Sequence, residues 1–383
     1  MAADDDIFKV GVKLKSLSLG SEPRYSVLNV SRYSVPNISR LSVPNVFGNA
    51  TPNISKNAFI IEGGGTKGVY AIGVLLYLFE DNTYINLSKI DIFGGTSVGS
   101  YLATVLSLGC SREDLVAISK IINMSKLIDS KYKLPLTMYR FMTGGHLYND
   151  DGRIDIIQKV LNLRIDAIKK DLGIADEMFG GKDLTFGHVR KLISTYPSTY
   201  KHLLINLVDI SKNDQIFMTT LNTESDDIKL SHALLGSSAI PFIFKPMILP
   251  FDLVTQRYCY ETKNASTTNH LIDGGVSTNN PLDFFLINEE TYSTYNLWLL
   301  KFTTEPSYTK IDGVISLLRQ LTGYLVSGKN DIKMDLVQGA YHLNIINLHS
   351  NAGTLDIYTR DQIQKIIDDI YKQCLTEKLF FGA

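Results

Sequence analysis

The chain of 383 residues contains little of what disulfide frameworks, zinc sites and nucleic-acid surfaces require. Its three cysteines, Cys110, Cys259 and Cys374, are far apart and odd in number. This pattern argues against a disulfide framework and a zinc site, and it favours a reducing compartment. Lysine and arginine (38) nearly balance aspartate and glutamate (39), the formal net charge is −1, and no basic block occurs. We therefore expect no nucleic-acid partner.

Long hydrophobic runs are also absent. The longest uncharged stretch, residues 92–111, is interrupted by glycines and polar residues, which argues against a transmembrane segment. The first residues, MAADDDIFKV, are acidic and lack the pattern of a secretory signal peptide. These absences predict a cytoplasmic protein without a transmembrane segment.

Residues 1–56 are poor in large hydrophobic side chains. Within residues 25–56 a unit recurs as YSVLNVSR, YSVPNISR, LSVPNVFG and NATPNISK, with prolines that block a helix. We predict a low-complexity, disordered N-terminal arm. Arg24, Arg32 and Arg40 each precede a serine by two residues, which would suit a basophilic kinase. A linker without a function of its own is the simpler interpretation of the repeat.

The stretch that follows contains two strand–turn–helix units. Residues 58–61 form a short apolar run that ends at a glutamate and three glycines, and residues 69–79 have helical composition and spacing. Residues 90–93 and 98–108 repeat this arrangement around a second pair of glycines. Units this close together predict neighbouring parallel strands joined by a right-handed crossover, the beginning of an α/β sheet.

In the second of these turns, Ser97 lies between Gly95 and Gly99 in the sequence GTSVG. This is the G-x-S-x-G pattern of a nucleophile elbow, in which glycines leave room for a sharp turn that exposes the serine oxygen above the sheet. The following helix would bring its N-terminal N–H groups and positive dipole end near the same oxygen. The pattern therefore predicts a nucleophilic serine, although it also occurs by chance.

The first turn, GGGTKG at residues 63–68, has almost no side chains, so its backbone N–H groups can line up toward an anion. A nucleophile beside such donors is what acyl transfer requires. The same glycines also fit the dinucleotide pattern G-x-G-x-x-G, with Asp91 as a candidate ribose ligand. A P-loop is excluded because Val69 occupies the position of its lysine.

A third block follows two strand-like runs between residues 202 and 220 and a short helix that Pro241 ends. In the sequence HLIDGGVSTNNP, Asp273 ends an apolar run and is followed by Gly274 and Gly275. An aspartate in this position can point into an open site, whereas an Asx-turn is the simpler interpretation of the motif taken alone.

Taken in order, EGGGTKG, GTSVG, GSSAIPFIF and DGGVSTNNP closely resemble the sequence blocks of the patatin-like phospholipases. The resemblance covers residues 57–303 and implies a three-layer α/β fold, with a mostly parallel central sheet and helices on both faces. It implies a dyad of Ser97 as nucleophile and Asp273 as general base, without a metal ion or other cofactor. The oxyanion hole that it implies consists of Gly63, Gly64, Gly65, Thr66 and Gly68. Glu62 departs from the family pattern, because many members have aspartate there.

The resemblance implies a lipid acyl hydrolase of the phospholipase A type, which cleaves carboxylic esters of phospholipids at a membrane or lipid-particle surface. In this chemistry Asp273 would take the serine proton directly, and partial desolvation would make it a stronger base by raising its pKa. Two alternatives share the fold, a triacylglycerol lipase or general esterase and a lipid-binding protein without catalysis. Dinucleotide binding accounts for the first block only.

Residues 304–383 are predicted to form a C-terminal helical region packed on the catalytic domain. Several apolar residues of its first helix would contact a lipid interface or, more simply, pack in the core. They are Leu317, Leu318, Leu321, Tyr324 and Leu325. The terminal Leu379-Phe380-Phe381 offers the same two interpretations.

Four other residues near the motifs have competing interpretations. His270 precedes Asp273 by three positions and therefore faces the other side of a strand, so we expect it to be structural. Lys67 would either meet a lipid phosphate or form a solvated or salt-bridged part of its loop. Asn279 and Asn280 would either hydrogen-bond near the base or only shape a turn.

Overall fold

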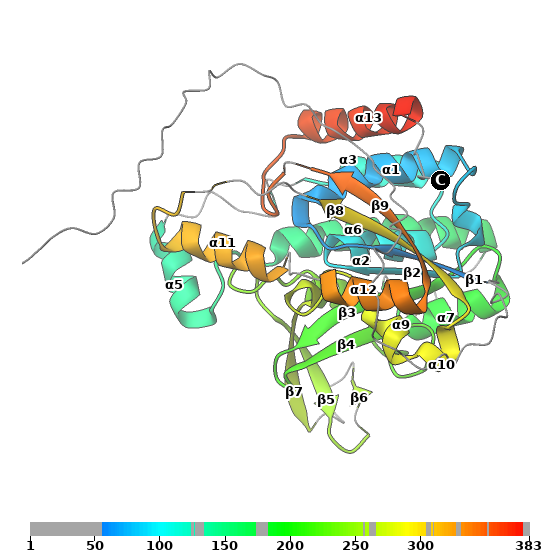
Figure 1. The fold of residues 1–383 in the computed structure, drawn as a ribbon. Coiled ribbons are helices and arrows are strands. Elements are labelled where there is room, and N and C mark those ends of the chain that lie inside the picture. The colour runs from blue at the N-terminus through cyan, green and yellow to red at the C-terminus, as the bar shows by residue number, and fades with distance from the viewer. Residues whose placement is uncertain are drawn as a thin grey trace, which may run out of the picture.

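The computed structural model describes residues 56–123, 126, 134–173, 183–255, 257–259, 266–303, 308, 310–326, 331–350 and 352–377. These residues form a central sheet with helices on both sides (Figure 1). The predicted N-terminal arm, up to residue 55, and the terminal residues 379–381 lie outside the described residues.

Nine strands of the described chain form one sheet in the order β6-β5-β7-β3-β2-β1-β8-β9, with β4 paired to β3. The strands are β1 (Lys56–Ile61), β2 (Ile92–Thr96), β3 (His202–Asp209), β4 (Asp214–Thr219), β5 (Met247–Asp252), β6 (Arg257–Tyr258), β7 (Thr267–Asp273), β8 (Tyr295–Thr303) and β9 (His342–His349). The neighbouring strands β3, β2, β1, β8 and β9 are parallel. Antiparallel strands extend the sheet beyond β3. The parallel centre confirms the predicted α/β fold class.

The helices occupy the connections and the C-terminal part of the chain. They are α1 (Gly68–Glu80), α2 (Val98–Ser107), α3 (Arg112–Ile121), α5 (Leu134–Gly144), α6 (Asp151–Leu172), α7 (Phe186–Thr195), α8 (Leu230–Ser237), α9 (Asp283–Ile287), α10 (Glu289–Tyr292), α11 (Val314–Val326), α12 (Asp331–Ala340) and α13 (Arg360–Glu377). Three short 3-10 turns, η1 (Gly65–Lys67), η2 (Leu87–Lys89) and η5 (Gly274–Val276), complete the set of named elements. Two of them, η1 and η5, lie within the predicted glycine-rich blocks.

Helices cover both faces of the sheet because successive strand residues point into two different hydrophobic layers. In β1, Phe59 and Ile61 pack in a core with apolar side chains of α1, α2, α3, α6 and α13. Ala58 and Ile60 pack in a second core with side chains of α9 and α12. All four residues are fully buried. A strand that is covered on both faces is expected to be apolar throughout, as the sequence of β1 is.

Strand β9 was not predicted, because residues 311–342 were interpreted as helices and residues 304–383 as a helical region. The run His342–His349 pairs in parallel with β8, and Ile345 and Ile346 are buried on the two faces of the sheet. A short apolar run cannot be assigned to a strand or a helix from its pattern alone, so its pairing with β8 decided its structure. The C-terminal region is therefore part of the central sheet.

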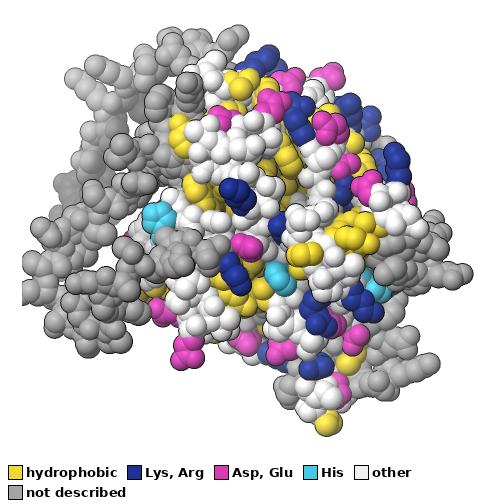
Figure 2. All heavy atoms as spheres, turned by 90° about the vertical axis from the view of Figure 1, so that its right-hand side faces the viewer, with side chains coloured by type: hydrophobic (Ala, Val, Ile, Leu, Met, Phe, Trp, Pro, Cys, Tyr) yellow, Lys and Arg dark blue, Asp and Glu magenta, His cyan; other side chains and the backbone are white. Residues whose placement is uncertain are grey.

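The surface seen in Figure 2 carries lysine, arginine, aspartate and glutamate side chains close to one another, with small hydrophobic areas between them. On this face the described residues form no continuous basic surface of the kind that binds nucleic acid. In the part of the chain that the structure describes, no helix is long and apolar enough to cross a membrane.

Candidate active site

The strand register places Ser97 and Asp273 on either side of β3. Thr96, the last residue of β2, pairs with Asn206 of β3, and Ser97 follows it directly. Asp273, the last residue of β7, pairs with Leu207, the next residue of β3. Neighbouring strands lie about 5 Å apart, so the two backbones are separated by roughly 10 Å at the same level of the sheet. This separation is one that two side chains directed toward each other can span.

The backbone of Ser97 is held in an uncommon conformation, with φ 52° and ψ −126°. Positive φ in a residue other than glycine costs on the order of 1–3 kcal/mol and persists only where surrounding contacts enforce it. The Ser97 N–H donates to Ser237 Oγ at 3.0 Å, and Ser237 Oγ donates to the Asn206 carbonyl oxygen at 2.8 Å. Close packing also requires Gly95, since a Cβ there would lie 2.3 Å from the Gly99 backbone. These contacts hold Ser97 at the beginning of α2.

Asp273 is completely buried and only partly hydrogen-bonded. Its Oδ1 accepts the backbone N–H of Gly275 at 2.8 Å. Its Oδ2 is buried and has no hydrogen-bond partner among the described residues. Burial raises the pKa of the Asp273 carboxyl to about 7, and the Gly275 N–H, the Ser97 side chain and the charge of Arg153 act in the opposite direction. A carboxyl with this pKa is a suitable general base near neutral pH.

Three backbone N–H groups of the predicted oxyanion hole are engaged in other hydrogen bonds. The Gly63 N–H donates to the Asn279 carbonyl oxygen at 2.9 Å, and the Thr66 N–H donates to the Thr354 carbonyl oxygen at 3.1 Å. The Gly68 N–H donates to carbonyl oxygens of the loop itself. The roles of Gly63, Thr66 and Gly68 in an oxyanion hole stay a prediction.

The backbone N–H groups of Gly64 and Gly65 differ, because no hydrogen-bond acceptor for either occurs among the described residues. Gly65 has φ +58°, and a Cβ there would lie 2.0 Å from the Thr354 carbonyl oxygen. Only glycine fits this conformation and this close approach. Gly63 lies against Ser97, since a Cβ on it would be 3.2 Å from Ser97 Cβ. Gly65 also lines the cavity together with Ser97, so the loop lies close to this serine.

Glu62, which is 3% exposed, anchors the glycine loop. Its carboxylate accepts the Phe302 backbone N–H at 2.9 Å and the Asn280 side-chain amide at 3.2 Å. Burial raises the pKa of Glu62 to about 7, while Lys301 lowers it. Lys67 is also largely buried and interacts with the charges of Glu62 and Asp356. These charge interactions favour the interpretation of Lys67 as a paired residue of its loop.

Asn279 and Asn280 do more than shape a turn. The Asn279 amide donates to the Gly63 carbonyl oxygen at 2.7 Å, and the Asn280 amide donates to Glu62. Both asparagines therefore tie the DGG block to the glycine loop. His270 lies elsewhere, with its Nδ1 3.3 Å from Ser211 Oγ.

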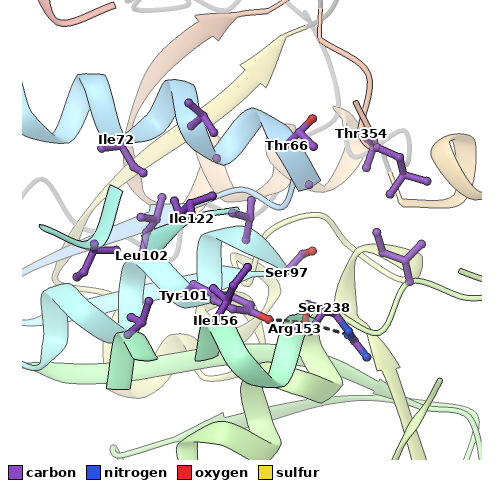
Figure 3. Close-up of a pocket in the computed structure, with 18 of the residues that line it drawn as sticks. Thr66, Ile72, Ser97, Tyr101, Leu102, Ile122, Arg153, Ile156, Ser238 and Thr354 are labelled. Carbon is purple, nitrogen blue, oxygen red and sulfur yellow. Dashed lines mark hydrogen bonds between the residues drawn. The ribbon is translucent and has the colours of Figure 1, made fainter. Parts of the chain in front are cut away.

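A group around Arg153 of α6, which the sequence did not identify as functional, supports the site. Arg153 Nη1 donates to Ser238 Oγ at 3.1 Å, and Ser238 Oγ also lies 2.8 Å from the Tyr101 hydroxyl (Figure 3). Arg153 Nη2 donates to Asp150 at 2.5 Å, and the guanidinium lies 4.3 Å from the Phe244 ring centroid. Of the four sequence blocks that carry the resemblance, GSSAIPFIF contains Ser238.

A cavity of about 150 Å³ extends from Ser97 between the helices on one face of the sheet. Its walls are mainly aliphatic and come from four helices: Ile72 of α1, Leu102 and Val105 of α2, Ile118 of α3, and Ile156 and Val160 of α6. Figure 3 labels Ile72, Leu102 and Ile156 among them. Polar groups lie at the end where Ser97 and Thr66 are found (Figure 3). An apolar chain with a polar group at one end matches such a cavity. Within the described residues, no group of three His, Cys, Asp or Glu side chains is arranged to hold a metal ion.

The sequence model of the family described as "Patatin-like phospholipase" matches residues 59–286, well over half of the chain. The chain belongs to the patatin-like phospholipase family. It is 48% identical over 332 residues to "Uncharacterized protein L620" of Acanthamoeba polyphaga mimivirus, which covers 85% of this chain and 89% of that protein. It is 23% identical over 248 residues to "Probable lipid hydrolase 463L" of Invertebrate iridescent virus 6, covering 64% of this chain and 69% of that protein.

Solved structures with a similar arrangement include VipD from Legionella pneumophila, at 15% identity and a TM-score of 0.41 over 84% of this chain. The complex of ExoU with SpcU from Pseudomonas aeruginosa gives 16% identity and a TM-score of 0.41 over 85% of this chain. This chain spans 66% of the VipD chain and 52% of the matched chain in the ExoU complex.

Proposed function

We propose that this protein is a lipid acyl hydrolase that cleaves carboxylic esters of phospholipids, with Ser97 as nucleophile and Asp273 as general base. The observation that carries the proposal is the buried Asp273 carboxyl, whose Oδ2 has no hydrogen-bond partner among the described residues and whose pKa is lowered by the Ser97 side chain. Membership of the patatin-like phospholipase family supports lipid ester hydrolysis as the reaction class.

In the proposed reaction, Asp273 takes the proton of the Ser97 hydroxyl as the oxygen attacks the ester carbonyl. The N–H groups of Gly64 and Gly65 then donate to the oxyanion that forms. Collapse of the tetrahedral intermediate releases the alcohol, which receives its proton from Asp273. A water molecule, deprotonated by the same carboxylate, hydrolyses the acyl-enzyme and releases the fatty acid.

The aliphatic cavity supports a fatty acyl group as the acyl part of the substrate. Its walls carry few polar atoms, so an acyl chain would bury apolar surface there at about 25 cal/mol per Å². The same cavity would serve a triacylglycerol lipase or general esterase, which remains the alternative activity, and a lipid-binding protein without turnover is the non-catalytic alternative.

The exposed face of α11 supports contact with a lipid surface. Leu317, Leu321, Tyr324 and Leu325 are 41%, 47%, 66% and 39% exposed, so ordinary core packing does not account for them. Their spacing of four, three and one residues puts them on one face of the helix. The helix adjoins the site, because the Thr322 hydroxyl on its buried face donates to the Pro241 carbonyl oxygen at 3.5 Å.

The test of the reaction is release of fatty acid from mixed phospholipid vesicles in the presence of a chelator. We expect release by the wild type and its loss in Ser97→Ala and Asp273→Asn. Ser107→Ala is the matched control, because Ser107 is a buried serine of the same helix whose hydroxyl donates to Thr104 and which does not line the cavity. Equal release by Ser97→Ala and the wild type would refute the dyad.

The lipid-surface contact is tested with the combined variant Leu317→Ser, Leu321→Ser and Tyr324→Ser. We expect it to release less fatty acid from vesicles while retaining hydrolysis of a soluble short-chain ester. Leu375→Ser serves as a control because Leu375 is similarly exposed, at 48%, on the distant helix α13. Unchanged vesicle hydrolysis by the combined variant would exclude α11 as the contact face.

A further inference from the structure

The loop of residues 352–356, which follows β9, packs directly on the glycine loop. Thr66 makes two hydrogen bonds to it, from its N–H to the Thr354 carbonyl oxygen at 3.1 Å and from its hydroxyl to the Gly353 carbonyl oxygen at 2.6 Å. The Thr354 carbonyl is also the atom that a Cβ on Gly65 would meet at 2.0 Å. Figure 3 shows Thr66 and Thr354 at the same end of the cavity, above Ser97.

This loop is itself well anchored. The Ser350 N–H donates to the Thr303 carbonyl oxygen at 2.9 Å, which continues the pairing of β9 with β8. The Ala352 N–H donates to Ser350 Oγ at 3.1 Å, and the Gly353 N–H donates to Asp356 Oδ2 at 2.7 Å. Because these bonds connect the loop to the sheet, the loop can hold the glycine loop in one position.

Side chains of the same loop form part of the cavity wall. Thr354, Leu355 and Asp356 line the cavity together with Ser97. Leu355 is partly exposed and packs against a small apolar cluster that includes Ile240 and Phe244. Its position between solvent and the aliphatic walls is that of a residue at the cavity entrance. None of these loop residues lies within the matched range 59–286.

We propose that the loop of residues 352–356 is a specificity-determining part of the active site, in which Leu355 limits the acyl groups that enter the cavity and the Gly353 and Thr354 carbonyls position the glycine loop through Thr66. This inference rests on the proposed ester hydrolysis, because it assigns a role in choosing and positioning the ester. Leu355 acts by contact with the acyl chain, and Thr66 acts through the glycine loop.

The entrance role is tested with Leu355→Ala and Leu355→Trp, using p-nitrophenyl butanoate and p-nitrophenyl dodecanoate as probes. Leu355→Ala widens the entrance, so the ratio of kcat/KM for dodecanoate to that for butanoate should rise, by about tenfold if one side chain's apolar contact is at stake. Leu355→Trp should lower the same ratio by a similar factor. Ile357→Ala and Ile357→Trp are matched controls, because Ile357 is nearby, 48% exposed and does not line the cavity.

The positioning role is tested with Thr66→Val and Thr66→Ser. Valine removes the hydroxyl that donates to Gly353 while keeping a similar shape, so kcat should fall with little change in KM. Serine retains the hydroxyl and should restore kcat toward that of the wild type. A general loss of stability would not separate kcat from KM in this way.

The entrance role of Leu355 and the proposed ester hydrolysis are refuted by different outcomes. If the wild type hydrolyses both esters and the Leu355→Ala variant folds but keeps the wild-type ratio, the entrance role is wrong, whatever happens in the tryptophan variant. If the wild type hydrolyses no ester and no vesicle lipid, the proposed function itself is refuted, and the inference that rests on it is refuted too.

Discussion

Replacing Asp273 with asparagine should abolish hydrolysis and at the same time stabilise the folded protein at alkaline pH. Asparagine keeps an oxygen for the Gly275 N–H that Asp273 Oδ1 accepts at 2.8 Å. It carries no charge, so it cannot take the proton of the Ser97 hydroxyl. The substitution removes the general base. It also removes a carboxylate whose negative charge, present at alkaline pH, is poorly solvated because the side chain is buried.

The magnitude follows from the pKa of the buried carboxyl. Its pKa rises from 3.8 to about 7 on burial, so the folded state binds a proton that the unfolded state releases between these values. The stability associated with this group is fully present below about pH 4 and is lost as the pH rises through about 7. Between pH 5 and pH 8 the loss amounts to about 3 kcal/mol, at 1.36 kcal/mol for each tenfold change in proton concentration up to the folded-state pKa.

The assay is urea-induced unfolding of wild type and Asp273→Asn at pH 5 and at pH 8, with fatty acid release measured on the same preparations. The stability of the variant relative to the wild type should increase by about 3 kcal/mol between the two pH values. Glu62, whose pKa is also raised to about 7, is present in both proteins. Its contribution therefore cancels in the comparison, as does any pH-independent effect of the amide.

Two results would refute this reasoning. A difference in stability between variant and wild type that is the same at pH 5 and pH 8 would mean that the Asp273 carboxyl is not protonated near neutral pH in the folded protein. Hydrolysis by Asp273→Asn at the wild-type rate would mean that another group accepts the serine proton.

Three further predictions concern Arg153, Gly65 and His270. Arg153→Met should move the acidic limb of the pH dependence of kcat/KM to higher pH, because the positive charge of Arg153 lowers the pKa of Asp273; an unmoved limb would contradict this. Gly65→Ala should destabilise the protein by at least about 2 kcal/mol in urea unfolding and reduce hydrolysis, since the position has φ +58° and no room beside Thr354. His270→Ala should retain fatty acid release, because the His270 ring lies against Ser211; complete loss with an intact fold would require a histidine in the mechanism.

Much of the fold was predictable because local patterns and tertiary structure agree. The two strand–turn–helix units correspond to β1 with α1 and β2 with α2, and the predicted strands of residues 202–210 and 215–220 correspond to β3 and β4. Strong turn signals bound each of these runs, and the apolar runs of β1, β2 and β3 fit strands that are covered on both faces. Strand β9 was missed because its short apolar run lies between helical patterns and becomes a strand only by pairing with β8.

The candidate site was predictable only in part, because some of its contacts, like the pairing of β9, depend on distant parts of the chain. Ser97 and Asp273 lie in motifs that glycines mark, so both could be predicted from the sequence as candidate site residues. Arg153 lies outside the four blocks of the resemblance and Ser237 lies within GSSAIPFIF, but the roles of both depend on which backbone and side-chain atoms the fold brings next to them. The predicted oxyanion donors show the same limit, since the glycine run did not indicate which N–H groups form hydrogen bonds inside the protein.

The sequence by itself determined the α/β class, the G-x-S-x-G pattern around Ser97 and the family, because glycine spacing and apolar runs are local properties of the chain. The tertiary structure alone decided that β7 runs antiparallel to β3 and brings Asp273 back to the level of Ser97. It also decided that a loop 287 residues after Thr66 completes the wall of the cavity. Pairing partners and distant contacts depend on how the whole chain buries its apolar surface and satisfies its backbone, and no local pattern encodes them.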